Sequence, residues 1–204
     1  MLSAIRFWPQ PLLGLDIQAE EIRLLQLQGT LKKKRIKNAV ATPLPRGAVV
    51  NGKIHEAETV TDCLQTMVEK NKLQWSRVAI ALPEQCVMSQ RIRVAKGLSE
   101  SELEVEMMTH LRHAFPDVID GFFYDYLIVD SSQAMQDEVL LIATSYANLN
   151  IPLSVVQNAG LKIHVVDVDH YALDRANEYI EFDGIALEEK WRISFGLALW
   201  SYRW

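Results

Sequence analysis

The sequence predicts an α/β protein, and three observations lead to that class. Short runs of strand-forming residues alternate with longer segments whose apolar residues recur every three or four positions. The 204 residues are 49% hydrophobic and 23% charged, the mixture of a globular protein with a sizeable core. The middle of the chain departs from this alternation with a strand, a helix and two strands in succession.

The first third of the chain has a β-β-β-α-β order. Residues 12–29, LLGLDIQAEEIRLLQLQG, predict two strands joined by a sharp turn, and an Asn-Gly pair at 51–52 predicts a second turn. A helix is expected at about 57–72, where apolar residues recur at helical spacing. The remaining strands are expected at 36–41 and at 77–83, whose unbroken apolar run is typical of a buried strand.

A fully marked helix start dominates the middle of the chain. Ser99 can cap the helix, Glu102 completes a capping box, and Leu98 with Leu103 forms a hydrophobic staple. Strands are expected at 88–97, 122–130, 137–145 and 162–169, and further helices at 146–159 and 170–180. The last stretch is rich in aromatic residues, including Trp191, Trp200 and Trp204, so it should be buried or form an interface.

Composition excludes several function classes. A net charge of −5 and a pI near 5.6 give no electrostatic reason to expect nucleic-acid binding. The basic run at 32–37 is either a solvated strand edge or a weak contact with an anionic membrane. Arg6 and the early prolines interrupt any signal-peptide core, and no window approaches the ~18 apolar residues of a membrane helix. With Cys63 and Cys86 as its two widely separated cysteines, the protein is expected in the cytoplasm.

Residues 81–116 and 159–176 carry a family resemblance. Gly97-Leu98-Ser99 followed by Glu102-Leu103 matches a "GLSxxEL" helix start, and AGLKIHVVDVDHYALDRA resembles "AGLxxxxVDVxxxAL". Together with the opening LLGLDI, which is similar to "GIDIG", these motifs resemble the PilM family of actin-like proteins of type IV pilus assembly. The resemblance covers roughly residues 12–180.

The resemblance implies an FtsA-like, actin-like (ribonuclease-H-like) lobe with an inserted strand-helix-strand-strand subdomain of the SHS2 type. Residues 1–82 would form the first part of the lobe and 83–161 the insertion. Residues 162–204 would complete the lobe and add the Trp-rich tail. The second nucleotide-binding lobe of the family is expected to be missing, and the tail at 195–200 resembles the family's late "xGLAL". The tail is hypothesised to cover the face that the lost lobe would leave open.

ATP and Mg²⁺ are the cofactors that the resemblance implies, held at the turn after "GIDIG". Asp16 is the matching acidic residue and the one candidate cofactor contact. The family turn is small and polar, whereas this turn reads Gln18, Ala19, Glu20, Glu21, and two carboxylates beside a phosphate repel it. We therefore expect no ATPase activity, no catalytic residue, no bound cofactor and no metal.

The resemblance also implies the function of a cytoplasmic adaptor in the pilus inner-membrane platform. Its partner would be the N-terminal cytoplasmic peptide of a PilN-like membrane protein, an "NLLP"-type segment docked between the lobe and its insertion. That partner would hold the chain at the periphery of the inner membrane. Other platform proteins and a second copy are further expected partners. The alternatives are a functional actin-like ATP-binding protein, and a type II secretion or cell-division adaptor of the same superfamily.

Two side-chain pairs also have metal-site spacing. His110 and His113 lie three residues apart on the capped helix, and Asp167 and Asp169 alternate along a strand. An exposed helix face for the histidines and solvation at the strand end for the aspartates are the competing interpretations.

Overall fold

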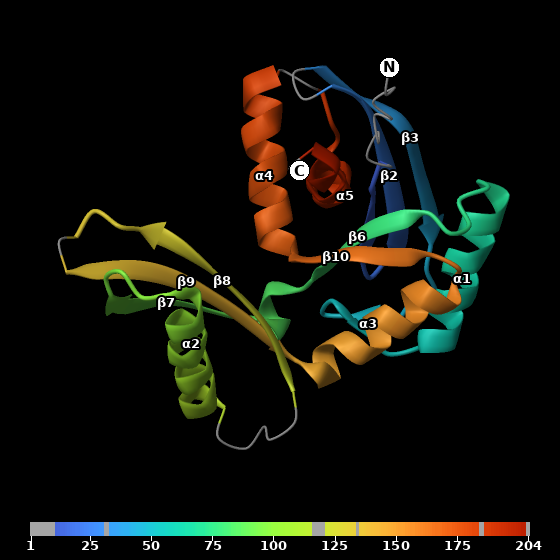
Figure 1. Ribbon diagram of the computed structural model, residues 1–204. Helices are drawn as coiled ribbons and strands as arrows, with labels where there is room; N and C mark the ends of the chain where they lie inside the picture. The colour runs from blue at the N-terminus through green and yellow to red at the C-terminus, as the bar shows by residue number, and fades with distance from the viewer. Residues whose placement is uncertain (1–10, 31–32, 116–120, 134, 184–185, 203–204) are drawn as a thin grey trace, which may run out of the picture. The chain divides into compact units, whose positions relative to one another are not determined.

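The structure of the protein is a computed structural model that describes residues 11–30, 33–115, 121–133, 135–183 and 186–202 (Figure 1). Lys32 of the basic run, Arg6 and Trp204 lie outside these ranges. The chain divides into two compact units. The lobe combines residues 1–83 with 151–204, and the subdomain is formed by residues 84–150.

A five-stranded sheet forms the centre of the lobe. Its strands are β1 Leu13–Ile17, β2 Glu21–Thr30, β3 Lys33–Pro43, β6 Arg77–Leu82 and β10 Lys162–Val168. They lie in the order β10-β6-β1-β2-β3, with β10, β6 and β1 parallel and β2 antiparallel to both of its neighbours. A two-stranded hairpin, β4 Val49–Val50 and β5 Lys53–Ile54, turns at Asn51 and Gly52, which have the positive φ angles predicted for Asn-Gly.

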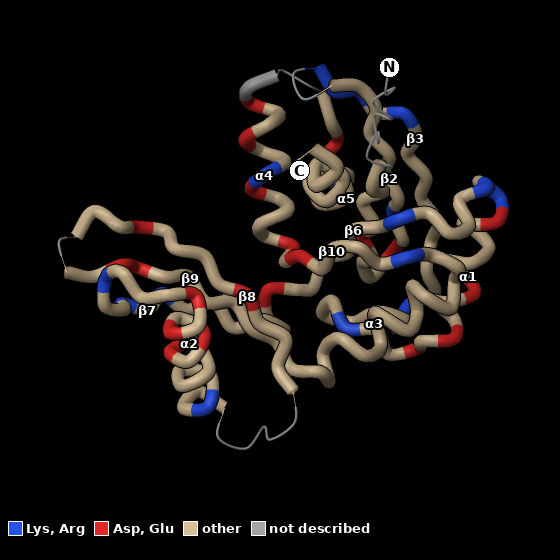
Figure 2. Tube along the Cα trace, in the orientation of Figure 1, with Lys and Arg blue, Asp and Glu red and all other residues tan. Residues whose placement is uncertain are grey.

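Helices cover both faces of this sheet, as Figure 1 shows and Figure 2 repeats in the same orientation. The helices are α1 Ala57–Lys70, α3 Tyr146–Asn158, α4 Asp169–Asp183 and α5 Arg192–Ala198, with the short 3₁₀ turns η2 Glu189–Trp191 and η3 Leu199–Tyr202. A further 3₁₀ turn, η1 Glu84–Cys86, belongs to the subdomain. On one face, α1 and the part of α3 from Ile151 onward share a core with Leu13, Leu15 and the other side chains of that face. On the opposite face, α4 and α5 pack over Leu25, Leu27 and Ala79. The alternating pleat of the strands separates these two cores.

The C-terminal segment belongs to the lobe core. Phe195, Leu197 and Ala198 of α5 are fully buried, whereas Trp191 and Trp200 are half-buried. A Cβ on Gly14 of β1 would lie 1.8 Å from the backbone oxygen of Ser194, and a Cβ on Gly196 would lie 1.8 Å from that of Ala172. Glycine is therefore required at both positions because α5 contacts β1 and α4 through the backbone.

A three-stranded antiparallel sheet with one helix forms the subdomain. Its elements are β7 Met88–Ala95, α2 Glu100–Ala114, β8 Phe122–Asp130 and β9 Gln136–Ser145, and the strand order is β7-β9-β8. Leu103, Met107 and Leu111 of α2 pack on Ile92 and Leu141 of one sheet face. The predicted capping box is present: Ser99 Oγ accepts from the Glu102 N–H, and the Glu102 carboxylate accepts from the Ser99 N–H. The predicted α/β class with a strand-helix-strand-strand insertion is confirmed.

Candidate functional site

The turn between β1 and β2 is the site that the sequence singled out. Asp16 lies near the end of β1, and the backbone N–H of Gln18 donates to the Glu21 carbonyl oxygen at 3.1 Å, which closes the turn. Ala19 and Glu20 are exposed at its tip. Among the described non-glycine residues, positive φ angles occur at Asn51, Lys72 and Trp75 and not in this turn. The turn therefore lacks the left-handed residues that build many phosphate-binding nests.

Both oxygens of the Asp16 carboxylate accept hydrogen bonds from neighbouring side chains. Gln18 Nε2 donates to Oδ1 at 2.7 Å, and Arg23 Nη1 donates to Oδ2 at 3.1 Å. Asp16 is 3% exposed, and this burial raises the pKa of its carboxyl group above the ordinary 3.8. Hydrogen bonds from Gln18 and the charge of Arg23 oppose that rise, while the charge of Asp169 adds to it. The Asp16 carboxylate is thus enclosed by side chains of the turn and of β2.

Glu21 extends this network. Its Oε1 accepts from Arg23 Nε at 2.7 Å, so one guanidinium joins Glu21 to Asp16. The two carboxylates and the guanidinium form a compact cluster with one net negative charge, and the exposed Glu20 adds another. Sequence analysis named Asp16, Gln18, Glu20 and Glu21 but missed Arg23. Its position opposite Asp16 in the hairpin register is the signal that points to the pair.

A second buried ion pair lies on β10. Arg175 of α4 donates to Asp167 Oδ2 from Nη1 at 2.7 Å and from Nη2 at 2.5 Å, and the Trp200 indole N–H donates to the same oxygen at 2.7 Å. Arg175 also donates to the Gly196 carbonyl oxygen at 3.2 Å. The interpretation of Asp167 as a solvated strand-end residue is wrong, because this carboxylate connects β10, α4 and the C-terminal segment.

The paired histidines and aspartates do not belong to a larger cluster of metal-ligating side chains in the described part of the chain. No group of three or more His, Cys, Asp or Glu side chains with metal-binding geometry occurs there. His113 is exposed, and its Nδ1 lies 2.8 Å from the Thr109 carbonyl oxygen one helical turn away.

An open, partly apolar sheet face distinguishes the subdomain. Alternate β8 residues Phe123 and Leu127 are 43% and 65% exposed and lie on the face opposite α2. Leu140, the register partner of Leu127, and Ile142 are half-buried on the same face. Among the described residues β8 pairs only with β9, so its outer edge carries backbone N–H and C=O groups without a ladder partner. Sequence analysis identified the strand, but its alternation alone did not indicate which face is open.

Comparison with solved structures shows the fold. The protein is similar to a chain of a structure titled "PilM-PilN type IV pilus biogenesis complex", with a TM-score of 0.72 and 22% identity. The match covers 84% of this chain and 51% of that chain, so the protein spans about half the length of its relative. A match to the cytoplasmic domain of EpsL, an inner-membrane component of the type II secretion system of Vibrio cholerae, has a TM-score of 0.47 and 11% identity. It covers 79% of this chain and 58% of that domain.

None of the helices in the described residues is both long and apolar enough to span a membrane. Residues 14–183 match the family model for the type IV pilus assembly protein PilM, which includes the β1–β2 turn, the complete subdomain and α4. The expectation drawn from the helix-start and "VDV" motifs is therefore confirmed. The chain belongs to the PilM family of type IV pilus assembly proteins.

Proposed function

We propose that the protein is an adaptor of the type IV pilus inner-membrane platform that binds the cytoplasmic N-terminal peptide of a PilN-like membrane protein. Family membership and a fold similar to that in a PilM–PilN complex support this assignment. The observation that carries it is the unpaired edge of β8 beside an exposed apolar face. Through this partner the protein would be recruited to the cytoplasmic side of the inner membrane, near other platform proteins.

An extended peptide fits this surface by adding a strand to the sheet. The backbone groups on the outer edge of β8, which have no partner strand among the described residues, would hydrogen-bond the peptide main chain. Phe123, Leu127, Leu140 and Ile142 would contact every second side chain of the peptide. Such a surface favours a short peptide segment with apolar side chains at alternate positions. A peptide of the Leu-Leu-Pro type satisfies this requirement without nucleotide chemistry.

Isothermal titration with a synthetic PilN-type "NLLP" peptide tests the proposal. We expect saturable binding, which N-methylation of alternate peptide amides removes because it deletes the main-chain donors. Leu127→Asp should weaken binding by about tenfold or more, equivalent to about 1.4 kcal/mol. Val105→Asp is the matched control, because Val105 of α2 is 66% exposed but lies outside the sheet face. Absence of saturable binding up to millimolar peptide refutes the proposal.

We also propose that the β1–β2 turn binds no ATP or Mg²⁺ and that the protein is not an ATPase. Three features support this: the hydrogen bonds that enclose Asp16, the negative Glu20 and Glu21, and the lack of a left-handed turn residue. A phosphate at this turn would meet like charge, and a cation would have to displace Arg23 from Asp16. The residues present do not fit the nucleotide that the family resemblance implies.

Calorimetry with ATP and excess Mg²⁺ tests this second proposal. We expect no heat of binding at 1 mM nucleotide and no phosphate release above the buffer rate. Arg23→Ala is the informative variant, since it frees one Asp16 oxygen while leaving the remainder of the turn in place. Micromolar nucleotide binding by the unmodified chain would show that our interpretation of the turn is wrong.

A further inference from the structure

An exposed tryptophan lies in the loop of the lobe that joins α1 to β6. Trp75 is 71% exposed, the largest exposed fraction among the described aromatic side chains. An indole combines a large apolar ring with one polar N–H, and such a side chain is enriched at protein interfaces and at the headgroup level of membranes. The loop is therefore an interaction surface that the proposed function does not use.

The backbone of this loop holds Trp75 in a conformation that is unusual for its residue type. Its φ is +64°, and Lys72 in the same loop has a φ of +56°. Residues with a Cβ rarely adopt such angles, because the Cβ approaches the following carbonyl oxygen. The Trp75 N–H donates to the Gly160 carbonyl oxygen at 2.7 Å, and the Lys162 N–H donates to that of Ser76 at 2.9 Å. The fold thus keeps a bulky, exposed side chain in a strained position, which is typical of functional sites.

Four cationic residues accompany Trp75 at this end of the lobe. Lys70 ends α1, Lys72 lies in the loop, Arg77 begins β6 and Lys162 begins β10. The three lysines are exposed, and Arg77 is half-buried. Lys162 Nζ lies 5.6 Å from the centroid of the Trp75 ring, and Lys162 is the register partner of Arg77. We call these five residues the Trp75 surface.

Negative charge is scarce on the segments that form the Trp75 surface. Across residues 63–83 and 159–166 the sequence has one acidic residue, Glu69, whose Oε1 accepts from Gln65 Nε2 at 3.0 Å. Arg77 Nη2 contacts His164 Nε2, which carries no negative charge. Within the described residues neither Lys72 nor Lys162 forms an ion pair. Their charges are therefore available to an anionic partner.

The edge strand β3 extends this positive surface. From residue 22 to residue 55 the sequence has eight Lys and Arg residues and no Asp or Glu, although the whole chain has a net charge of −5. Lys33, Arg35 and Lys37 of β3 are exposed. Strand register places the first half of β3 at the same end of the sheet as the starts of β6 and β10, where Figure 2 shows blue segments. The acidic β1–β2 turn lies at the opposite end, so the lobe has one positive and one negative end.

We propose that the Trp75 surface contacts the anionic headgroups of a membrane. The indole would lie at the headgroup level, and the long lysine side chains would reach the lipid phosphates. Duplex nucleic acid would engage only the cations, whereas a headgroup layer engages both the apolar ring and the charges. The proposal goes beyond peptide binding at β8 and needs no PilN-like partner, because the surface lies entirely within this chain.

Flotation of the full chain with lipid vesicles tests the proposal. Vesicles of phosphatidylcholine with about 40% phosphatidylglycerol should bind at least about fivefold more tightly than phosphatidylcholine alone. Binding should weaken as salt rises towards about 1 M, since exposed charges are screened. Polyglutamate and a single-stranded oligonucleotide, each at the charge concentration of the lipid, should not displace the vesicles. Equal binding to neutral vesicles overturns the proposal, and so does displacement by either polyanion.

Two variants of the Trp75 surface locate the contact. Trp75→Asn should weaken vesicle binding about fivefold or more, because the interfacial ring is lost. Its unfolding temperature should equal or exceed that of the unmodified chain, since asparagine tolerates a positive φ. The double variant Lys72→Gln and Lys162→Gln should weaken binding about tenfold or more, because each charge near an anionic surface contributes about fivefold.

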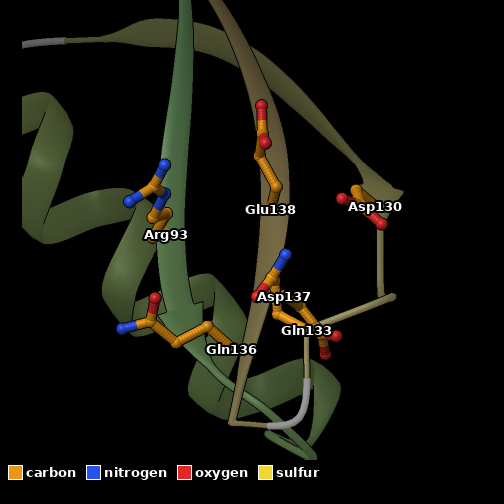
Figure 3. Close-up of a pocket in the computed structure, with 6 residues that line it drawn as sticks. All are labelled: Arg93, Asp130, Gln133, Gln136, Asp137 and Glu138. Atoms are coloured by element: carbon orange, nitrogen blue, oxygen red, sulfur yellow. The ribbon is translucent and has the colours of Figure 1, made fainter.

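Arg93→Gln is the matched control. Arg93 of β7 is exposed, but it lines a polar cavity of the subdomain together with Asp130, Asp137 and Glu138 (Figure 3). These carboxylates offset its attraction for an anionic surface, so its loss should leave vesicle binding unchanged. Undiminished binding by either variant of the Trp75 surface, an equal loss with Arg93→Gln, or a lower unfolding temperature of Trp75→Asn contradicts the assignment.

Discussion

Gly14→Ala is expected to displace the C-terminal helix from the lobe sheet. The added Cβ would lie 1.8 Å from the Ser194 carbonyl oxygen and 2.8 Å from the Ala198 nitrogen. Both atoms belong to the backbone of α5, so no side-chain rotation relieves the overlap. Gly14 is part of the LLGLDI segment. The close α5 backbone explains why this residue has no side chain, without any need for phosphate binding.

The magnitude follows from the overlap and from what α5 buries. Ordinary contact begins at 3.4 Å, so β1 and α5 must separate by about 1.6 Å at this point. Overpacking of a core costs about 1–3 kcal/mol, and part of the burial of Phe195 and Leu197 is lost in addition. We expect the free energy of unfolding to fall by about 2–4 kcal/mol. For a chain of this size, the unfolding temperature should fall by about 4–16 °C.

Urea unfolding followed by circular dichroism measures the change, and a double-mutant cycle shows its origin. Phe195→Ala alone should cost about 3–5 kcal/mol, because it leaves a cavity under α5. If Gly14→Ala acts by displacing α5, the double variant should lose less than the sum of the two single changes. A Gly14→Ala variant within about 0.5 kcal/mol of the unmodified chain would refute the close contact between β1 and α5.

Three further outcomes are expected. Trp200→Phe should lower the free energy of unfolding by about 1.5–3 kcal/mol in urea titrations, because Asp167 loses a charge-assisted hydrogen bond; an unchanged midpoint would contradict this. For Asp16 the raised pKa means that ionisation costs more free energy in the folded chain than in the unfolded chain, so its contribution to stability falls as pH rises above about 4. Asp16→Asn should therefore gain stability relative to the unmodified chain as pH rises above about 4, whereas a difference that does not change with pH argues against the shift. Deletion of residues 188–204 should lower the unfolding temperature or produce dimers in gel filtration, and a stable monomer would show that α5 is dispensable.

The elements of this protein were largely predictable because their signals are local. The Ser99 and Glu102 capping box lies within four residues, and the bounds predicted for β8 agree with the structure. The α1 and α4 predictions differ from the structure by a few residues at their ends, where local signals are weakest. The motifs at residues 12–17, 97–103 and 159–176, with their order and spacing, were sufficient to suggest the family.

The candidate sites were less predictable. The sequence alone showed that the β1–β2 turn is more acidic than the small, polar turn of the family, since Gln18, Glu20 and Glu21 lie close together in the chain. Its actual chemistry depends on Arg23, which reaches Asp16 only because β1 and β2 pair in one register. Asp137 begins the strand predicted at 137–145, and its burial opposite Val94 of β7 depends on a strand pairing that the sequence does not show.

By itself, the sequence determined the α/β class, the capped helix and the altered turn, because each depends on residues close together in the chain. The inserted subdomain was expected from the family resemblance. Only the tertiary structure decided that residue 14 must be glycine, because the α5 backbone contacts it. It also decided that Asp167 accepts a hydrogen bond from Trp200, 33 residues away. The same holds for the hydrogen bond from the Leu12 N–H to the Ser201 hydroxyl, which spans 189 residues. Such contacts have no local signature, since chain segments remote in sequence meet only when the whole lobe has packed.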